Sequence, residues 1–144
     1  MAEVFVVDAS VAAKWIMPAS IEPFAQQADD LFKNYKQGQV ELVVPDLFWS
    51  ELGNILWKGV RRKLISADAA DISLQRMTTH NFTTIPSQSV LSRALSIAIS
   101  FDRSIYDSIY VALAVSQKAQ LITADEKLAN ALAAYFPIKW LGLF

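Results

Sequence analysis

The sequence VFVVDAS, residues 4–10, joins a short apolar run to an acidic residue and two small residues. The run from Val4 to Val7 is β-branched and aromatic, which predicts a buried strand. Asp8 follows directly, and a helical pattern then extends from Ala9 to about Ile16 and is stopped by Pro18. The stretch therefore predicts a strand that leads at once into a helix, with a carboxylate at the junction.

The same alternation of short apolar strands and longer helices continues to the end of the chain. It predicts a three-layer α/β/α sandwich with a central parallel sheet. No linker, repeat or low-complexity stretch interrupts it, so one domain spanning residues 1–144 is expected. The further predicted strands are 40–44, 82–85 and 120–123, with an edge strand at 138–141. The further predicted helices are 23–37, 46–62, 66–79, 87–100 and 105–119, and one between Asp125 and Pro137. Asp46 and Ser66 can cap the helices that begin at those residues.

Composition narrows the kind of site that this chain can build. The 144 residues include no cysteine and a single histidine, His80, which excludes disulfides, thiolate–zinc sites and multi-histidine metal sites. A site for a hard cation with oxygen ligands stays open. Net charge is −1, which argues against a strongly basic nucleic-acid binder but allows local basic clusters.

Apolar residues make up 53% of the chain and charged residues 19%, below the ~25% of ordinary globular proteins. Either part of the surface is covered by a second copy or a partner, or the domain is small and tightly packed. The first residues carry no signal-peptide pattern, and no apolar run approaches the ~18 residues of a membrane span. A cytoplasmic protein without membrane contact is expected.

Two acidic residues follow predicted strands. Asp8 comes directly after the first strand, and Asp125 lies two residues beyond the strand 120–123. Ligands of open parallel sheets bind at the carboxyl ends of strands, near a switch in strand order. Each of the two residues could instead cap the helix that follows it, and one residue can do both.

Two further acidic residues lie on predicted helices. Glu51 falls one turn inside the helix that begins near Asp46, on a face that also carries Asn54. This face could equally be a solvent-exposed polar stripe. Asp107 opens a strongly apolar helix, where an acid also favours the helix dipole. Asp102 lies nearby and is the rival candidate for its role.

These four acids, if they converge, require neutralisation. Carboxylates ~6 Å apart repel by roughly 3 kcal/mol at an effective dielectric constant of ~20. A domain with a stability of ~5–15 kcal/mol cannot carry several such pairs. Relief comes from protonation, which raises a pKa, or from a divalent cation. With oxygen ligands alone, that cation is expected to be Mg²⁺ or Mn²⁺.

Four segments together resemble the PIN-domain nucleases, and in particular the VapC-type toxins of toxin–antitoxin pairs. The resemblance covers nearly the whole chain, and it depends on the order and spacing of the segments. Residues 6–10 (VVDAS) resemble the family's opening strand with its first acid, and residues 51–54 (ELGN) resemble the second acid with the Asn that follows it. Residues 106–114 (YDSIYVALA) resemble the helix that carries the third acid, and residues 121–125 (LITAD) resemble the last strand with the fourth acid.

The resemblance implies a parallel sheet with its acids at one edge, and metal-dependent endonucleolytic cleavage of RNA. The metal would make hydroxide available for attack on the phosphodiester and would offset charge on the phosphate. The implied partners are an RNA substrate, a small VapB-like antitoxin protein and a second copy of the chain. Asp8, Glu51, Asp107 and Asp125 would be the catalytic and metal-binding residues; Ser10, Asn54 and Thr123 would orient carboxylates or water.

An acidic cluster repels the phosphate backbone of RNA, so RNA affinity must come partly from nearby basic side chains. The candidates are Lys14, Lys58, Arg61, Arg62 and Arg103, each of which could also be plain surface charge. Three other functions stay open: an RNA-processing nuclease of the same fold without an antitoxin, a phosphoacceptor signalling domain, and a binding module without activity. A phosphoacceptor domain needs adjacent acids after an early strand, whereas Asp8 is followed by Ala9.

Overall fold

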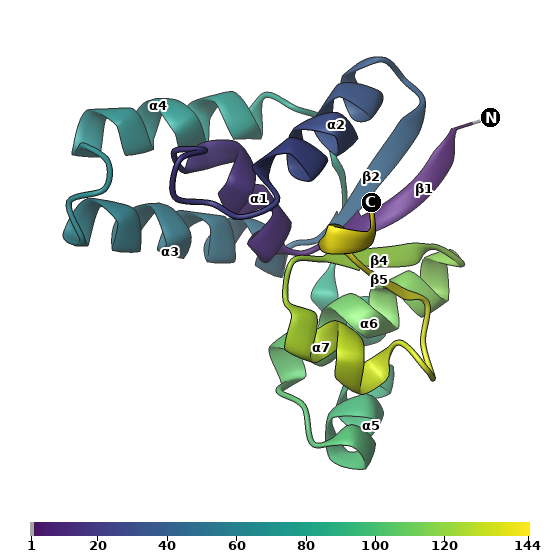
Figure 1. The fold of residues 1–144 in the computed structure, drawn as a ribbon. Helices are drawn as coiled ribbons and strands as arrows, with labels where there is room; N and C mark the ends of the chain where they lie inside the picture. Colours follow the sequence, from purple (N-terminus) through teal and green to yellow (C-terminus); the bar gives the residue numbers. More distant parts are fainter. Residues whose placement is uncertain (1) are drawn as a thin grey trace.

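A five-stranded parallel sheet forms the centre of the protein, with the strand order β3-β2-β1-β4-β5 in a computed structural model that describes residues 2–144. The strands are β1 (Glu3–Val7), β2 (Val40–Pro45), β3 (Thr83–Ile85), β4 (Gln120–Thr123) and β5 (Ile138–Trp140). Helices cover both faces, so the predicted α/β/α sandwich is confirmed (Figure 1). None of the helices within residues 2–144 has the length and apolar character needed to cross a membrane.

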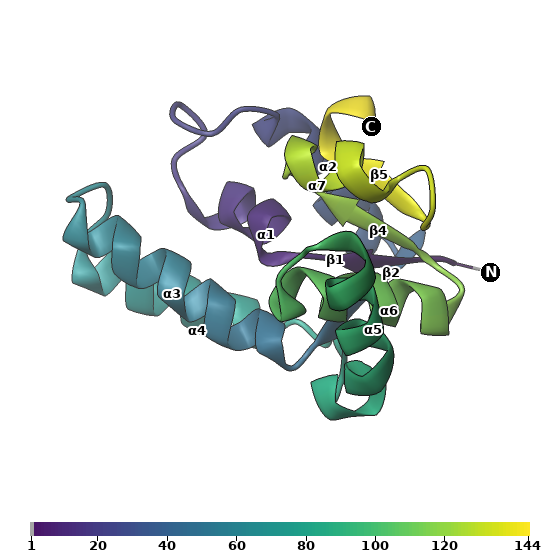
Figure 2. The same cartoon turned by 90° about the horizontal axis from the view of Figure 1, so that it is seen from below.

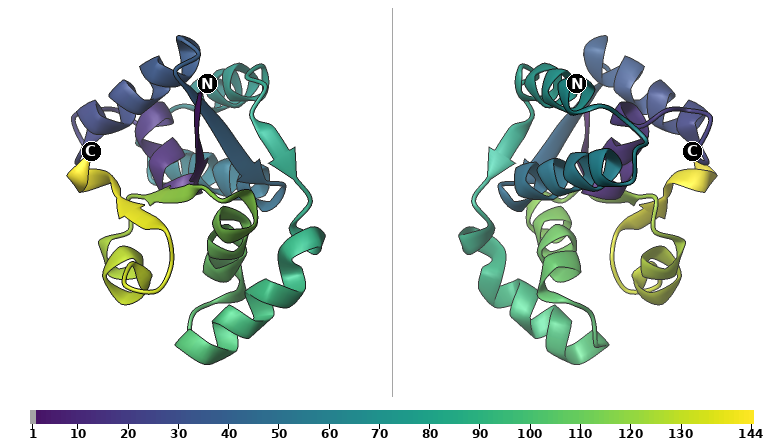
Figure 3. Two further views of the ribbon diagram at one scale, coloured as in Figure 1. Left: turned by 90° about the vertical axis from the view of Figure 1, so that its right-hand side faces the viewer. Right: turned by 90° about the vertical axis from the view of Figure 1, so that its left-hand side faces the viewer.

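The two helical layers differ in shape. Helices α5, α6 and α7 lie on one face of the sheet, and α1 and α2 lie on the other (Figure 3). Helices α3 and α4 pack against each other as an antiparallel pair that projects from the side of the sheet (Figure 2). The bounds are α1 (Ala9–Ile16), α2 (Ala25–Lys36), α3 (Leu47–Arg61), α4 (Ala67–Thr78), α5 (Leu91–Phe101), α6 (Ile105–Gln117) and α7 (Glu126–Leu132), with short 3₁₀ helices at Ser87–Val90 and Leu141–Leu143.

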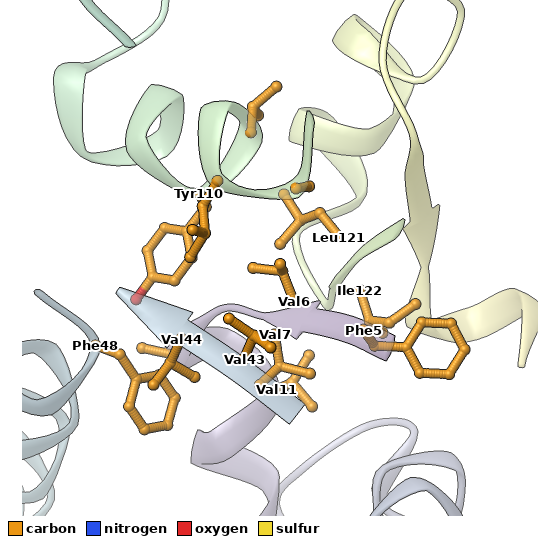
Figure 4. Packing of buried hydrophobic residues seen from close by; sticks show 14 of the residues in the cluster. Phe5, Val6, Val7, Val11, Val43, Val44, Phe48, Tyr110, Leu121 and Ile122 are labelled. Carbon is orange, nitrogen blue, oxygen red and sulfur yellow. The ribbon is translucent and has the colours of Figure 1, made fainter. Parts of the chain in front are cut away.

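The core lies on both faces of β1, β2 and β4, against α6 on one face and against α1, α2 and the start of α3 on the other. The inner strand residues Val6, Val7, Val44 and Ile122 are fully buried (Figure 4). Helix α6 is buried continuously from residue 108 to residue 114, which explains why its sequence is apolar around most of its circumference. Parallel strands are covered on both faces, so their residues form continuous apolar runs rather than alternating ones.

Three of the capping residues considered from the sequence are confirmed, and a fourth is not. Asp8, Ser66 and Asp125 accept hydrogen bonds from backbone N–H groups of the helices that follow them. The expectation that Asp46 caps α3 was wrong: its carboxylate makes no capping bond to that helix. It accepts from the backbone N–H (3.0 Å) and the hydroxyl of Ser87 instead, and these bonds lower the pKa of Asp46.

The strand order places a switch point between β1 and β4. From β1 the chain moves to β2 and β3 on one side, and later returns to β4 and β5 on the other. The register pairs Val6 with Leu121 and Val7 with Ile122, so both strands end at the same level. Asp8 and Asp125 therefore lie at the edge where parallel sheets bind their ligands.

Candidate functional site

Asp8 is the most buried carboxylate of this edge. Its side chain is 8% exposed and accepts hydrogen bonds from the backbone N–H groups of Ser10 (3.1 Å) and Val11 (3.4 Å), and from the Ser10 hydroxyl. Burial raises the pKa of Asp8 from its ordinary value of 3.8 to about 6, although bonds from Ser10, Thr123 and Val11 act in the opposite direction. The negative charge of Glu51 raises it further.

Ser10 and Thr123 join the ends of β1 and β4. The Ser10 hydroxyl donates to Asp8 and accepts from the backbone N–H of Ala124 (3.0 Å). The Thr123 hydroxyl lies 3.5 Å from it and accepts from the backbone N–H of Asp125 (3.0 Å). These contacts fix the Asp8 carboxylate relative to the start of α7.

Glu51 reaches the same region from α3. Its Oε1 accepts a hydrogen bond from the Tyr110 hydroxyl of α6 at 2.6 Å, and Figure 4 shows the Tyr110 ring extending from α6 towards the end of β2. Burial raises the pKa of Glu51, the Tyr110 bond lowers it, and the charge of Asp107 raises it. Glu51 therefore interacts electrostatically with both Asp8 and Asp107.

Tyr110 is the residue of this site that sequence reasoning missed. Burial and the charges of Glu51 and Asp8 raise the pKa of Tyr110 well above its ordinary value, so the hydroxyl stays protonated and donates. In the sequence Tyr110 lies one helical turn after Asp107, within an apolar run typical of a core helix. Only its position one turn from an acid, on the same helix face, could have indicated a polar role.

Asp107 and Asp125 lie nearer the surface. Asp107 is in the first turn of α6, where its backbone N–H bonds to the Ser104 hydroxyl, and its carboxylate forms an ion pair with Arg103. Asp125 is exposed and caps α7 through Leu128 (3.1 Å). The rival Asp102 ends α5 in a left-handed conformation (φ 53°) and is exposed. Asp107, not Asp102, is the residue whose charge acts on Glu51.

The predicted acids thus share one edge of the sheet but do not form a tight cage. Across residues 2–144, no three Asp, Glu, His or Cys side chains are close enough to make a metal cluster. Mg²⁺ is commonly held by one or two carboxylates and several waters, which this arrangement allows. The donor set is entirely oxygen, and Asp8 is buried without an ion-pair partner among residues 2–144. The residues therefore fit a hard divalent cation.

The candidate basic residues on α1 and α3 occupy two different environments. Lys14 is buried on α1 and forms an ion pair with Glu22 (3.1 Å), so a phosphate could reach it only by displacing that carboxylate. Lys58, Arg61 and Arg62 are exposed at the far end of α3, and the Arg61 guanidinium lies over the Trp57 ring (5.2 Å). Asn54 is exposed on α3 beyond Glu51.

Comparisons with known proteins agree with this architecture. Residues 5–132 match the family model described as PIN domain. A curated relative, Ribonuclease VapC3 of Pyrobaculum aerophilum, is 35% identical over 136 residues, which are 90% of this chain and 95% of that protein.

Two solved structures share the fold. The crystal structure of PAE2754 from Pyrobaculum aerophilum has a TM-score of 0.70 at 24% identity, covering 99% of this chain and 94% of that one. A toxin–antitoxin complex from Klebsiella pneumoniae contains a chain with a TM-score of 0.64 at 15% identity, covering 93% of this chain and 94% of that one.

Proposed function

Because this chain belongs to the PIN-domain family, we propose that it is the ribonuclease toxin of a toxin–antitoxin pair and hydrolyses RNA with Mg²⁺ or Mn²⁺. The observation that carries the proposal is the buried carboxylate of Asp8 at the switch point of the sheet. It has no ion-pair partner among residues 2–144, and burial raises its pKa to about 6. A carboxylate kept in such surroundings favours a cation ligand.

We assign cation binding to Asp8, Glu51 and Asp107, with Asp125 at the outer rim of the same edge. Because no three of these carboxylates within residues 2–144 are close enough to ligate one ion together, some of them would act through bound water. When bound, a divalent cation supplies activated water and offsets negative charge on the phosphate. Ser10 and Thr123 hold the Asp8 carboxylate in one orientation. The Tyr110 hydroxyl donates a hydrogen bond to Oε1 of Glu51 and so keeps the Glu51 side chain directed into the site.

The decisive assay incubates the purified protein with total RNA and Mn²⁺, with and without a chelator, and maps the cut ends. We expect discrete cleavage with Mn²⁺ and none after chelation, because in the proposed reaction the cation lowers the pKa of the attacking water and offsets charge on the phosphate. Cleavage that continues in the chelator would contradict metal dependence, and intact RNA under all conditions would contradict the ribonuclease assignment.

Tyr110→Phe should lower the cleavage rate by about 10-fold, the lower end of the scale for groups that orient ligands. The Tyr110 hydrogen bond stabilises the ionised form of Glu51, so its loss raises the pKa of Glu51 further. The acidic limb of the pH–rate profile should therefore move to higher pH. Tyr106→Phe, on the exposed side of the same helix, is the matched control. An unchanged acidic limb in Tyr110→Phe would reject this role.

An antitoxin partner is the second part of the proposal. A groove of about 330 Å³ between α1, α2 and α4 is lined by the aromatic residues Trp15, Phe32 and His80 and by the cations Lys33, Lys36 and Arg76. It suits a peptide with apolar side chains flanked by acidic ones.

A reading frame for a small antitoxin should lie beside the gene of this protein. The Lys33→Glu variant should bind that antitoxin more weakly without any change in RNA cleavage. Without such a partner, the chain would be an RNA-processing nuclease of the same fold.

We also propose that the protein is a homodimer. Helix α5 carries Leu91, Leu95 and Ile99 at four-residue spacing, 44%, 54% and 75% exposed. Such a stripe is typical of a helix that packs against another surface. Sedimentation of the wild-type protein should give a dimer, and Leu95→Glu should give a monomer. A wild-type monomer at micromolar concentration would contradict this part of the proposal.

A further inference from the structure

Arg103 occupies the short connection between α5 and α6, beside the acidic edge of the sheet. Its backbone N–H donates to the carbonyl of Ala98 (3.2 Å), which ties the connection to the end of α5. One terminal nitrogen of its side chain, Nη2, donates to Oδ2 of Asp107 at 3.1 Å. The two side chains are 24% and 35% exposed, so the pair lies at the rim of the site rather than in open solvent.

One N–H group of the Arg103 guanidinium makes no hydrogen bond within residues 2–144. Nε of Arg103 is buried and has no hydrogen-bond partner within residues 2–144. A buried N–H without an acceptor is unfavourable, and such groups call for an explanation by water, an ion or a ligand. Arginine presents its donors in a planar fork that matches two oxygens of a phosphate. An anionic oxygen would satisfy Nε once the guanidinium turns outward, because the atom is buried in its present position beside Asp107.

The location of this donor matters because the surrounding charges are negative. Asp107 is bonded to Arg103, and the charge of Asp107 reaches Glu51. A phosphate that approaches these carboxylates is repelled unless a positive group meets it there. Among the basic residues considered from sequence, Arg103 is the one in direct contact with a residue of the acidic edge, whereas Lys14 is held by Glu22.

We propose that Arg103 binds the RNA phosphate at the site of cleavage, and that it competes with the divalent cation for Asp107. This inference rests on the proposed function. In the protein without cation, the guanidinium neutralises Asp107. Once a cation occupies that carboxylate, the guanidinium is free to turn its fork to the phosphate. Arg103 thus couples cation binding to RNA binding.

Two effects of opposite sign follow for Arg103→Gln. Binding of Mn²⁺ without RNA should tighten by about 3- to 10-fold, because the competing charge is gone. Binding of a short RNA should weaken by about 10- to 100-fold, the scale of a lost charge-assisted hydrogen bond. Arg103→Lys keeps the charge without the fork, so it should keep wild-type Mn²⁺ affinity and bind RNA more weakly.

The experiment measures Mn²⁺ affinity by calorimetry in the otherwise wild-type protein. It measures RNA affinity by fluorescence anisotropy in the same otherwise wild-type background with Ca²⁺ in place of Mn²⁺, because Ca²⁺ takes oxygen ligands but is a weak activator of water, so the cation site is filled and the RNA stays intact. Arg93→Gln, on the exposed surface of α5, removes an equal charge and should change both affinities by less than about twofold, as expected for a distant surface charge. Thermal unfolding confirms that each variant is folded, and Arg103→Lys carries the test if Arg103→Gln is not.

Unchanged or weaker Mn²⁺ affinity in folded Arg103→Gln would overturn the competition for Asp107. If Arg103→Gln binds RNA within twofold of the protein with Arg103, phosphate binding by Arg103 is overturned. If the wild-type protein nevertheless cleaves RNA, the proposed function stands without this inference. If the wild-type protein cleaves no RNA, the proposed function fails together with the RNA part. The calorimetry then still decides whether Arg103 and a cation compete.

Discussion

The Asp8→Asn variant is expected to cleave RNA at least about 100-fold more slowly than the wild-type protein, the scale on which one electrostatic group contributes to catalysis. At pH 7 and without metal, the same variant is expected to be more stable than the wild-type protein. Asn keeps the shape of the side chain, and its carbonyl oxygen can still accept from Ser10 and Val11. It cannot supply the charge that a divalent cation needs. The substitution therefore separates the metal-binding role that we propose for Asp8 from its observed role in capping α1.

The gain in stability follows from the position of Asp8 in the fold. Burial disfavours the ionised carboxylate and raises the pKa of Asp8 from 3.8 to about 6. Each unit of pKa difference corresponds to ~1.4 kcal/mol, so the ionised group costs up to about 3 kcal/mol at pH 7. Asn removes this cost. A residue that only capped the helix would show the opposite, because substitution of a cap destabilises by ~1 kcal/mol.

Urea denaturation in the presence of a chelator gives the stability difference, and the RNA assay gives the loss of activity. Asp68→Asn, an exposed acid in the first turn of α4, is the matched control. It should leave cleavage unchanged and alter stability by less than about 0.5 kcal/mol, as surface substitutions do. An Asp8→Asn protein that cleaves RNA normally would refute the site, and one that is less stable than wild type would refute the account of the buried charge.

The strand and helix pattern was predictable because each element carries a local signal. The apolar run 4–7, the helix-ending Pro18 and the capping residues Asp8 and Ser66 all gave elements that the structure confirms. The 3₁₀ turn Ser87–Val90 was missed, since its sequence is also compatible with the first turn of an α-helix. Asp46 was misassigned because its partner, Ser87, lies 41 residues away in the chain.

The site was predictable only in part, for the same physical reason. Strand ends locate Asp8 and Asp125, because the carboxyl ends of parallel strands meet at one edge. The contacts that decide how the acids behave join distant parts of the sequence. Tyr110 bonds to Glu51 across 59 residues, and Ser10 bonds to Ala124 across 114. Sequence periodicity carries no information about such pairs, so neither contact could be foreseen.

The stability of the protein without metal should fall as the pH rises from about 4 to about 7. The folded-state pKa of Asp8 lies near 6 and exceeds its ordinary value of 3.8, so between these values the folded state binds the proton more tightly than the unfolded state. Stability then decreases with pH across that window, by up to about 3 kcal/mol at ~1.4 kcal/mol per unit. The raised pKa of Glu51 acts in the same direction.

A divalent cation should reverse this trend, because it binds the ionised carboxylates and so stabilises the folded state above pH 6. At a free Mn²⁺ concentration 100 times the dissociation constant, the gain is about 2.7 kcal/mol. Urea midpoints across this pH range, measured with a chelator and with Mn²⁺, should therefore diverge as the pH rises, and Asp8→Asn should flatten the chelator curve. If the wild-type curve in chelator rises with pH instead, Asp8 is stabilised by its ionisation, and the argument that its buried charge is kept for a cation fails.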